Sequence, residues 1–244
     1  MQSSGISSRE TPSASQSPAG PTLKRFALSG HSTRVDPRID AVRGDLADVR
    51  LAERVFAPHY ALAITVSANT ATPILAAAKA GATALSEILP GEGFDVLEIA
   101  TEYAWGMCLG DGAVGFVARS TLDWTDPAAP APLLAGGPIE VAENLIGAPA
   151  RAGGRSPAGF DAAGLIFYIL TRTGHASPRF ADLQAKLGSE VEDGLARGDL
   201  VFFQDHAAIM ADTEHAIHVA DTVVREPLAI LAERFGPVIA RRRL

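Results

Sequence analysis

The amino-acid sequence predicts an α+β fold in which a small β-barrel precedes a second, mixed domain. From about residue 61 to residue 122, short apolar runs alternate with Gly-containing turns such as "LPGEGF" and "LGDGAVG", a pattern typical of several short strands. From Pro138 onward, helical patterns come first and strand patterns follow, which indicates an α+β domain. The length of 244 residues and the hydrophobic content of 47% are sufficient for a buried core in each part.

The N-terminal segments carry few signals of a packed core. Residues 1–23 are rich in Ser, Pro and Gly and are expected to be a disordered tail. Residues 24–60 are expected to be a helical lead-in, because Leu46 and Val49 begin an apolar repeat near helical spacing and Asp45 is placed as its N-cap.

The C-terminal segments divide into a linker and the second domain. Residues 123–137, "DWTDPAAPAPLLAGG", are expected to be a linker that follows the barrel of residues 61–122. Residues 138–244 form the α+β domain. Its helices are predicted in "IEVAENLIG", "AAGLIFYILTR" and "RFADLQAKLG", and its strands in "GDLVFF", "HAAIMAD", "HAIHVA" and "GPVIARRR".

Charge and cysteine content exclude several function classes. The net charge of −7 disfavours nucleic acid as a partner, since the only basic cluster is 241–243 at the C-terminus. The single cysteine, Cys108, allows neither an internal disulfide nor a Cys-based zinc site. No apolar run predicts a membrane span, and the N-terminus lacks the pattern of a secretory signal. We therefore expect a cytoplasmic protein without a cofactor, and the oligomeric state is left open.

The stretch "GGRSPAGFDAAGL" has the layout that presents a reactive side chain at a helix N-terminus. Such a position lowers the pKa of a thiol, because the helix dipole and free N–H groups favour negative charge. Here Asp161 caps the helix, but the next residues are Ala162 and Ala163, which carry no reactive group. His206 and His218 lie twelve positions apart on consecutive predicted strands, so a hairpin turning near 212–214 would place the two imidazoles side by side.

These motifs resemble those of the NlpC-type peptidoglycan peptidases, which are bacterial papain-like cysteine peptidases. The family signature is Pro-Tyr-x-Trp-Gly-Gly, Gly-x-Asp-Cys-Ser-Gly-Leu, Gly-Asp-Leu-aromatic-aromatic, His-x-Gly-Ile and a further His. This chain reads "PARAGG", "GFDAAGL", "GDLVFF", "HAAI" and His218 in the same order. The segment "SEILPGEGFDVLEIATEYAWGMCLGDGAVGFVARSTL" also resembles a bacterial SH3-like domain, so the resemblance covers roughly 35–244.

The resemblance implies a papain-like domain that follows an SH3-like barrel and cleaves the γ-D-glutamyl–diamino acid bond of murein peptides. It assigns Ala162 to the position of the nucleophilic Cys, with His206 as base and His218 as the group that orients it. Around the nucleophile, four positions depart together from the family pattern: Ala150, Ala152, Ala162 and Ala163. Residues expected to contact a substrate are Asp161, Ala163, Ala150, Arg155 and Tyr103, and no metal ligands are assigned.

Because an Ala methyl cannot attack a carbonyl, the leading hypothesis is a catalytically inactive homologue that retains binding of murein-derived peptide. Cys108 and Ser156 are weaker nucleophile candidates, since Cys108 is expected to be buried on a strand and Ser156 to lie in a turn. A metal held by His206, His218 and Asp161 ranks low. Two alternatives stay open: an active peptide hydrolase whose Cys was replaced at Ala162, and a purely structural or interaction protein.

Overall fold

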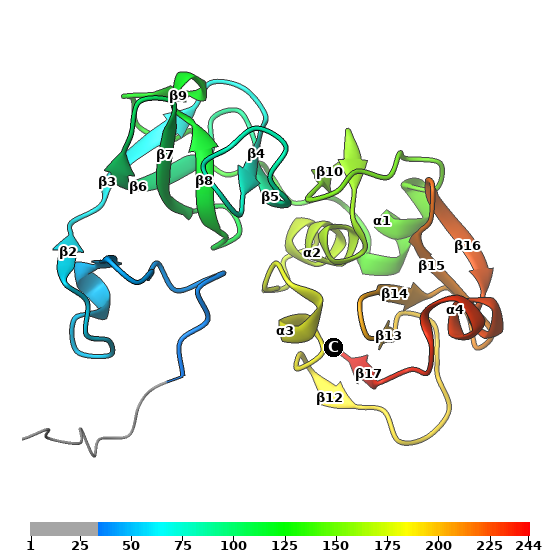
Figure 1. Ribbon diagram of the computed structural model, residues 1–244. Helices are drawn as coiled ribbons and strands as arrows, with labels where there is room; N and C mark the ends of the chain where they lie inside the picture. Colours follow the sequence, from blue (N-terminus) through cyan, green and yellow to red (C-terminus); the bar gives the residue numbers. More distant parts are fainter. Residues whose placement is uncertain (1–33) are drawn as a thin grey trace, which may run out of the picture. The chain divides into compact units, whose positions relative to one another are not determined.

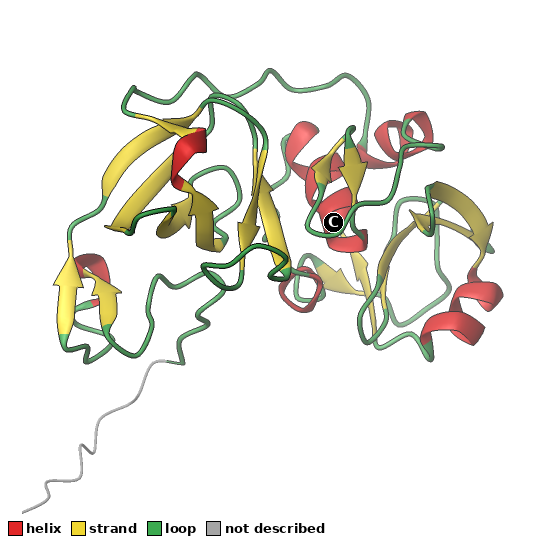
Figure 2. Cartoon of the chain, turned by 45° about the horizontal axis from the view of Figure 1, so that its top comes forward, coloured by secondary structure: helices red, strands yellow, loops and turns green. Residues whose placement is uncertain are grey.

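The computed structural model describes residues 34–244, so the expected disordered tail of residues 1–23 lies outside the described residues. Within residues 34–244, the regular elements of the N-terminal part are short strands and two 3-10 turns, and the α-helices belong to the C-terminal part (Figures 1 and 2). No helix among residues 34–244 has the length and apolar character needed to cross a membrane.

The described part of the lead-in, residues 34–60, is not the helix that the sequence predicts. It forms a parallel strand pair, and Asp48 begins only one 3-10 turn by accepting a 2.8 Å hydrogen bond from the Arg50 backbone N–H. The Asp48 carboxylate is buried and also binds the Arg50 guanidinium, while the predicted cap, Asp45, pairs with Arg43 instead. Strand pairing therefore outweighs the apolar repeat. The elements are β1 (Leu46–Asp48), η1 (Val49–Leu51) and β2 (His59–Ala61).

The predicted strands of residues 61–122 are confirmed, but a closed barrel is not shown. Seven strands form one antiparallel sheet in the order β5-β4-β8-β7-β6-β3-β9, with β5 and β9 at its ends. Buried side chains such as Ile74, Phe94 and Val117 form its core, and Trp105 packs in a second cluster. The elements are β3 (Ile64–Ala68), β4 (Thr72–Leu75), β5 (Ala84–Ile88), β6 (Gly93–Ile99), β7 (Tyr103–Cys108), β8 (Val114–Ala118), η2 (Arg119–Thr121) and β9 (Leu122–Asp123).

The C-terminal part is an α+β arrangement, as predicted. A six-stranded sheet has the order β12-β17-β13-β14-β15-β16. The helices are α1 (Pro138–Asn144), α2 (Ala162–Arg172), α3 (Ala181–Gln184) and α4 (Leu228–Phe235). The strands are β10 (Arg155–Ser156), β11 (Gly159–Phe160), β12 (Ser189–Glu190), β13 (Leu200–Phe202), β14 (Ala207–Met210), β15 (His215–Val219), β16 (Val223–Pro227) and β17 (Ala240–Arg243). The sequence analysis did not predict β16 and α4.

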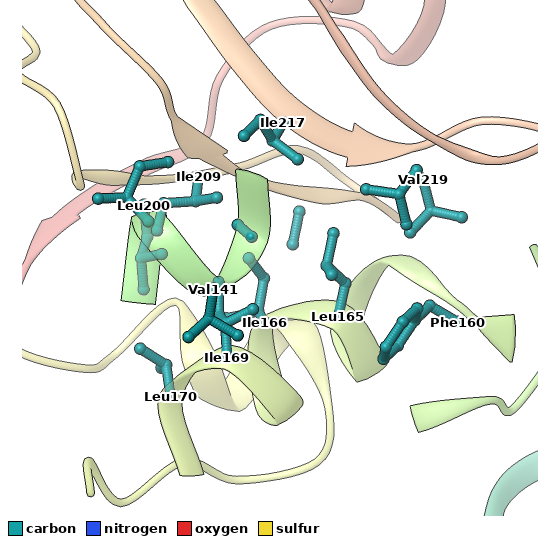
Figure 3. Close-up of a cluster of buried hydrophobic side chains, with 14 of the residues drawn as sticks. Val141, Phe160, Leu165, Ile166, Ile169, Leu170, Leu200, Ile209, Ile217 and Val219 are labelled. Carbon is teal, nitrogen blue, oxygen red and sulfur yellow. The ribbon is translucent and has the colours of Figure 1, made fainter. Parts of the chain in front are cut away.

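Helices cover both faces of the six-stranded sheet. On one face, α1 and α2 pack against alternate strand residues, and Figure 3 shows Leu165 and Ile166 of α2 facing Ile217 and Val219 of β15. On the other face, Leu231 of α4 packs with the intervening strand residues, which are Val201, Ala208, Met210 and Ala216. The period-2 alternation of strand side chains thus separates two hydrophobic clusters.

The expected linker of residues 123–137 contains no helix or strand after Asp123. It is held at both ends: the Ala128 N–H donates to the Gly91 carbonyl at 2.8 Å, and the Leu134 N–H donates to the Arg172 carbonyl at 2.7 Å. These bonds fix the linker to the N-terminal sheet and to the end of α2.

Candidate functional site

The N-terminus of α2 is built as the sequence predicts. The Asp161 carboxylate accepts a 2.6 Å hydrogen bond from the Gly164 N–H, which is the N-cap interaction. Gly164 is required by packing, since a Cβ there would lie 2.0 Å from the Gly154 carbonyl oxygen. The loop before the helix is closed by the β10–β11 pair. The first helical residue is nevertheless Ala162, which is partly exposed and carries only a methyl group.

Asp161 does more than cap the helix, because its carboxylate also binds Arg179. The Arg179 Nη1 and Nη2 atoms lie 3.0 Å and 2.5 Å from the two carboxylate oxygens. The Arg179 side chain is 1% exposed, and its Nε donates to the Ser86 hydroxyl of β5 at 2.9 Å. The Arg179 guanidinium is therefore already paired with the Asp161 carboxylate, which we expected to bind a substrate amine.

Arg155, expected to contact a substrate, belongs to a buried ion-pair network. Its Nε lies 2.9 Å from Asp111 and 3.0 Å from the Glu87 carbonyl, and its Nη1 donates to Glu92 at 3.1 Å. Burial opposes its charge, but Asp111 and Glu92 prevail and raise the pKa of Arg155. The side chain is 4% exposed, so its donors bind the N-terminal sheet rather than facing solvent. Sequence patterns carried no signal for these distant partners.

The two predicted histidines meet, as their spacing indicates. The hairpin of β14 and β15 places the His206 Nε2 3.0 Å from the His218 Nδ1, and the His218 Nε2 lies 3.1 Å from a Glu226 carboxylate oxygen. Glu226 in turn binds Arg234 at 3.2 Å. The sequence analysis missed Glu226, although the register of β15 with β16 pairs it with Ala216, two residues before His218.

Phe235, the last residue of α4, covers the histidine pair. Its ring stacks on His206 with a centroid separation of 3.9 Å and an interplanar angle of 9°. Burial, with smaller contributions from the charges of His218 and Arg234, lowers the pKa of His206 from 6.5 to about 4. Burial also lowers the pKa of His218, although Glu226 opposes that shift. Both imidazoles are therefore neutral at pH 7.

The histidine pair lies on the sheet face that α4 covers. His218 stands between Ile217 and Val219, whose side chains pack with α2, so its own side chain leaves the sheet on the opposite face. The Ala162 side chain is a methyl group, so it can form neither a hydrogen bond nor a ring contact with His206 or His218. The assignment of His206 to Ala162 as a catalytic unit thus stays a prediction.

Of the remaining candidates, Ala150 and Ala163 lie close to the α2 N-terminus, whereas Tyr103 lies on β7. Ala150 is exposed and pairs with Phe160 beside β11, while the Ala163 carbonyl accepts a 2.9 Å bond from the buried Gln184. Tyr103 lies on β7 and lines a hollow formed only by residues 101–124, so it is not seen in a groove shared with the second domain.

The alternative nucleophiles and ligands also have structural positions. Cys108 is buried, and burial raises the pKa of its thiol, which disfavours the thiolate. The Ser156 hydroxyl lies 3.4 Å from the Arg151 guanidinium in the β10–β11 hairpin. Within residues 34–244, no three His, Cys, Asp or Glu side chains gather as a metal site would require.

Comparison with known proteins gives a consistent family. The NlpC/P60 family profile matches residues 147–230. The gamma-DL-glutamyl hydrolase of Bacillus subtilis (strain 168) is 33% identical over 86 residues, which cover 34% of this chain and 21% of the hydrolase. The match therefore spans about a fifth of that relative.

Solved structures of the same family are also similar to this chain. NlpC1 from Trichomonas vaginalis is 17% identical, with 75% of this chain and 69% of that chain covered and a TM-score of 0.41. An NlpC/P60 family protein from Bacillus cereus is 20% identical, with 73% and 62% covered and a TM-score of 0.41. The profile match contains the α2 N-terminus, the histidine pair and Glu226, so these features lie in the part of the chain that is similar to the NlpC/P60 family.

Proposed function

We propose that this chain is a catalytically inactive member of a peptidoglycan-hydrolase family that binds a murein-derived peptide without cleaving it. The observation that carries the proposal is Ala162 at the first position of α2, directly after the Asp161 cap. A covalent peptidase mechanism requires a nucleophile at such a position, and without one no acyl-enzyme forms. Neither Cys108 nor Ser156 supplies a replacement, since one is buried and the other bonds within a turn.

The state of His206 supports the same proposal. A general base works best when its pKa lies near the operating pH, and the pKa of His206 is lowered to about 4. In a cysteine peptidase, a neighbouring thiolate would stabilise the protonated imidazole. Here His206 faces the apolar ring of Phe235 on one side and neutral His218 on the other. The His206 imidazole is thus kept neutral and shielded from solvent by Phe235. This state favours a packing role for His206 over a role in proton transfer.

The Asp161–Arg179 pair determines how a peptide would bind. By the resemblance, the carboxylate of Asp161 would receive the free amine of a γ-glutamyl peptide, a bond class that the name of the Bacillus subtilis relative also indicates. Because Arg179 already neutralises this carboxylate, a peptide amine must compete with an intramolecular partner. We therefore expect weak binding, with a Kd of about 1 mM, a binding free energy of only about −4 kcal/mol.

The same ion pair favours a second candidate function, that of a structural or interaction module. In such a module the expected substrate site at Asp161 is filled by the chain's own side chains. Arg179 and Arg155, both almost fully buried, join the α2 region to β5 and to the loop between β5 and β6. Under this candidate the arginines hold two parts of the molecule together, and Asp161 has no ligand role.

Titration calorimetry with L-Ala-γ-D-Glu-diaminopimelate separates the two candidates. Peptide binding predicts measurable heat at millimolar ligand, and Asp161→Asn is expected to abolish it, whereas the exposed Asp193→Asn, outside the site, serves as the matched control. Absence of heat at millimolar peptide would exclude the binding function and leave the structural module.

A further inference from the structure

A hollow at one end of the N-terminal sheet is a candidate binding site that the NlpC/P60 domain does not share. Its volume is about 660 Å³, within the range of roughly 300–1,000 Å³ typical of small-molecule sites. All its lining residues lie between Thr101 and Trp124. They come from the β6–β7 turn, from η2 and from the end of β9. We call it the Trp124 hollow.

Two aromatic side chains border the Trp124 hollow. Tyr103 is half-buried at the start of β7, and Trp124 is 62% exposed although it is among the largest apolar groups of the chain. By contrast, Trp105 is 4% exposed and belongs to the core. An aromatic ring left exposed beside a concave polar surface offers a flat apolar face to a ligand.

The backbone around Trp124 is fixed rather than free. On one side, the Asn69 Nδ2 donates to the Asp123 carboxylate at 3.0 Å, and on the other, the hydroxyls of Ser67 and Thr125 lie 2.7 Å apart. Ser67 is itself buried on β3. The backbone that carries Trp124 is therefore held at the rim before any ligand arrives, which reduces the entropy lost on binding.

The polar side chains of the hollow are available to a ligand. Glu102, Arg119 and Ser120 are exposed, and within residues 34–244 none of their side-chain polar atoms makes a hydrogen bond or salt bridge. Their backbones are ordered, since the Arg119 N–H donates to the Glu102 carbonyl at 2.8 Å. One carboxylate and one guanidinium give the hollow no net charge, so it does not select an anion or a cation.

From this combination we propose that the Trp124 hollow binds a neutral saccharide. A pyranose ring has an apolar C–H face, which would stack on Trp124 or Tyr103, and a rim of hydroxyl or acetamido groups. Glu102 would accept hydrogen bonds from hydroxyls, and Arg119 and Ser120 would donate to ring and acetamido oxygens. The site is independent of the proposed peptide function, because no residue of the NlpC/P60 domain lines it.

The test measures binding of tetra-N-acetylchitotetraose to the full chain by calorimetry. We expect a Kd of about 1 mM or tighter, and a loss of at least about tenfold in Trp124→Ala. Glu102→Gln is expected to weaken binding while preserving the rim. The matched control is Phe56→Ala, since Phe56 is 91% exposed on a different segment and should leave binding unchanged.

Acrylamide quenching of tryptophan fluorescence provides a second readout on the unmodified chain. Because Trp105 is buried, quenching reports mainly on Trp124, and the saccharide is expected to protect it. The proposal is overturned if 10 mM saccharide gives neither heat nor protection, or if Trp124→Ala and Phe56→Ala bind equally. A third outcome would also overturn the saccharide proposal. If the murein tripeptide gives heat that is lost in Trp124→Ala, and the saccharide gives none, the Trp124 hollow binds peptide instead.

Discussion

The neutral, buried state of His206 predicts a specific loss of stability at acidic pH. In the folded chain the pKa of His206 is lowered to about 4, mainly by burial beneath Phe235, whereas an unfolded chain has the ordinary value of 6.5. Between these two values the unfolded chain binds a proton that the folded chain does not. Stability therefore falls as the pH falls from 6.5 to 4, and this contribution is constant below pH 4.

The size of the effect follows from the two pKa values. Each pKa unit corresponds to about 1.4 kcal/mol. His206 alone therefore lowers the free energy of unfolding by about 2 kcal/mol between pH 7 and pH 5, and by about 3 kcal/mol between pH 7 and pH 4. The variant His206→Gln retains a polar side chain but cannot titrate, and it is expected to lose this part of the pH dependence. The exposed His175→Gln is the matched control and is expected to keep the wild-type profile.

Urea unfolding at a series of pH values, followed by circular dichroism, measures the difference between the chain and each variant. NMR titration of the imidazole C–H resonances gives the pKa of the histidine pair directly. The reasoning is refuted if His206→Gln shows the same loss of stability between pH 7 and pH 5 as the unmodified chain, or if His206 titrates near 6.5.

Three further predictions concern the same region. Phe235→Ala is expected to raise the pKa of His206 toward 6.5 by admitting water, and NMR titration checks it; an unchanged pKa would exclude Phe235 as the cause. Arg179→Met is expected to destabilise the fold by about 1–3 kcal/mol in urea unfolding, because the partly exposed Asp161 carboxylate loses its hydrogen bonds to Arg179. Asp161→Asn in the same chain should restore part of this loss, and no restoration would contradict the pairing. In Ala162→Cys, alkylation by iodoacetamide is expected to follow a thiol pKa of about 7.5–8.5, lowered only by the helix terminus. A thiol pKa below about 5 would show that His206 forms an ion pair there.

The local features of the site are those that the sequence predicts best. The Asp161 cap depends on residues within one helical turn, and the meeting of His206 with His218 depends on one hairpin. Both follow from short-range spacing. The same reasoning failed for the lead-in, where Leu46 fits a helical repeat but pairs with His59 in a parallel strand. Pairing with a distant segment decided that element.

The groups that set the chemistry of the site come from far along the chain. Arg179 reaches Asp161 from a loop after α2 and also bonds Ser86 of β5, a pairing that no local pattern encodes. Phe235 covers His206 only because α4 folds back over the sheet, and α4 itself was not predicted. These long-range contacts pair the Asp161 carboxylate with an internal cation and shield the His206 imidazole from water.

The proposal that the chain has no peptidase activity rests on Ala162, which stands where a covalent mechanism requires a nucleophile. Its most direct test is product release from L-Ala-γ-D-Glu-diaminopimelate by the unmodified full chain at pH 7, followed by mass spectrometry. We expect no release above the buffer blank, both with and without a chelator. Turnover by the unmodified chain that is abolished by His206→Ala would contradict it.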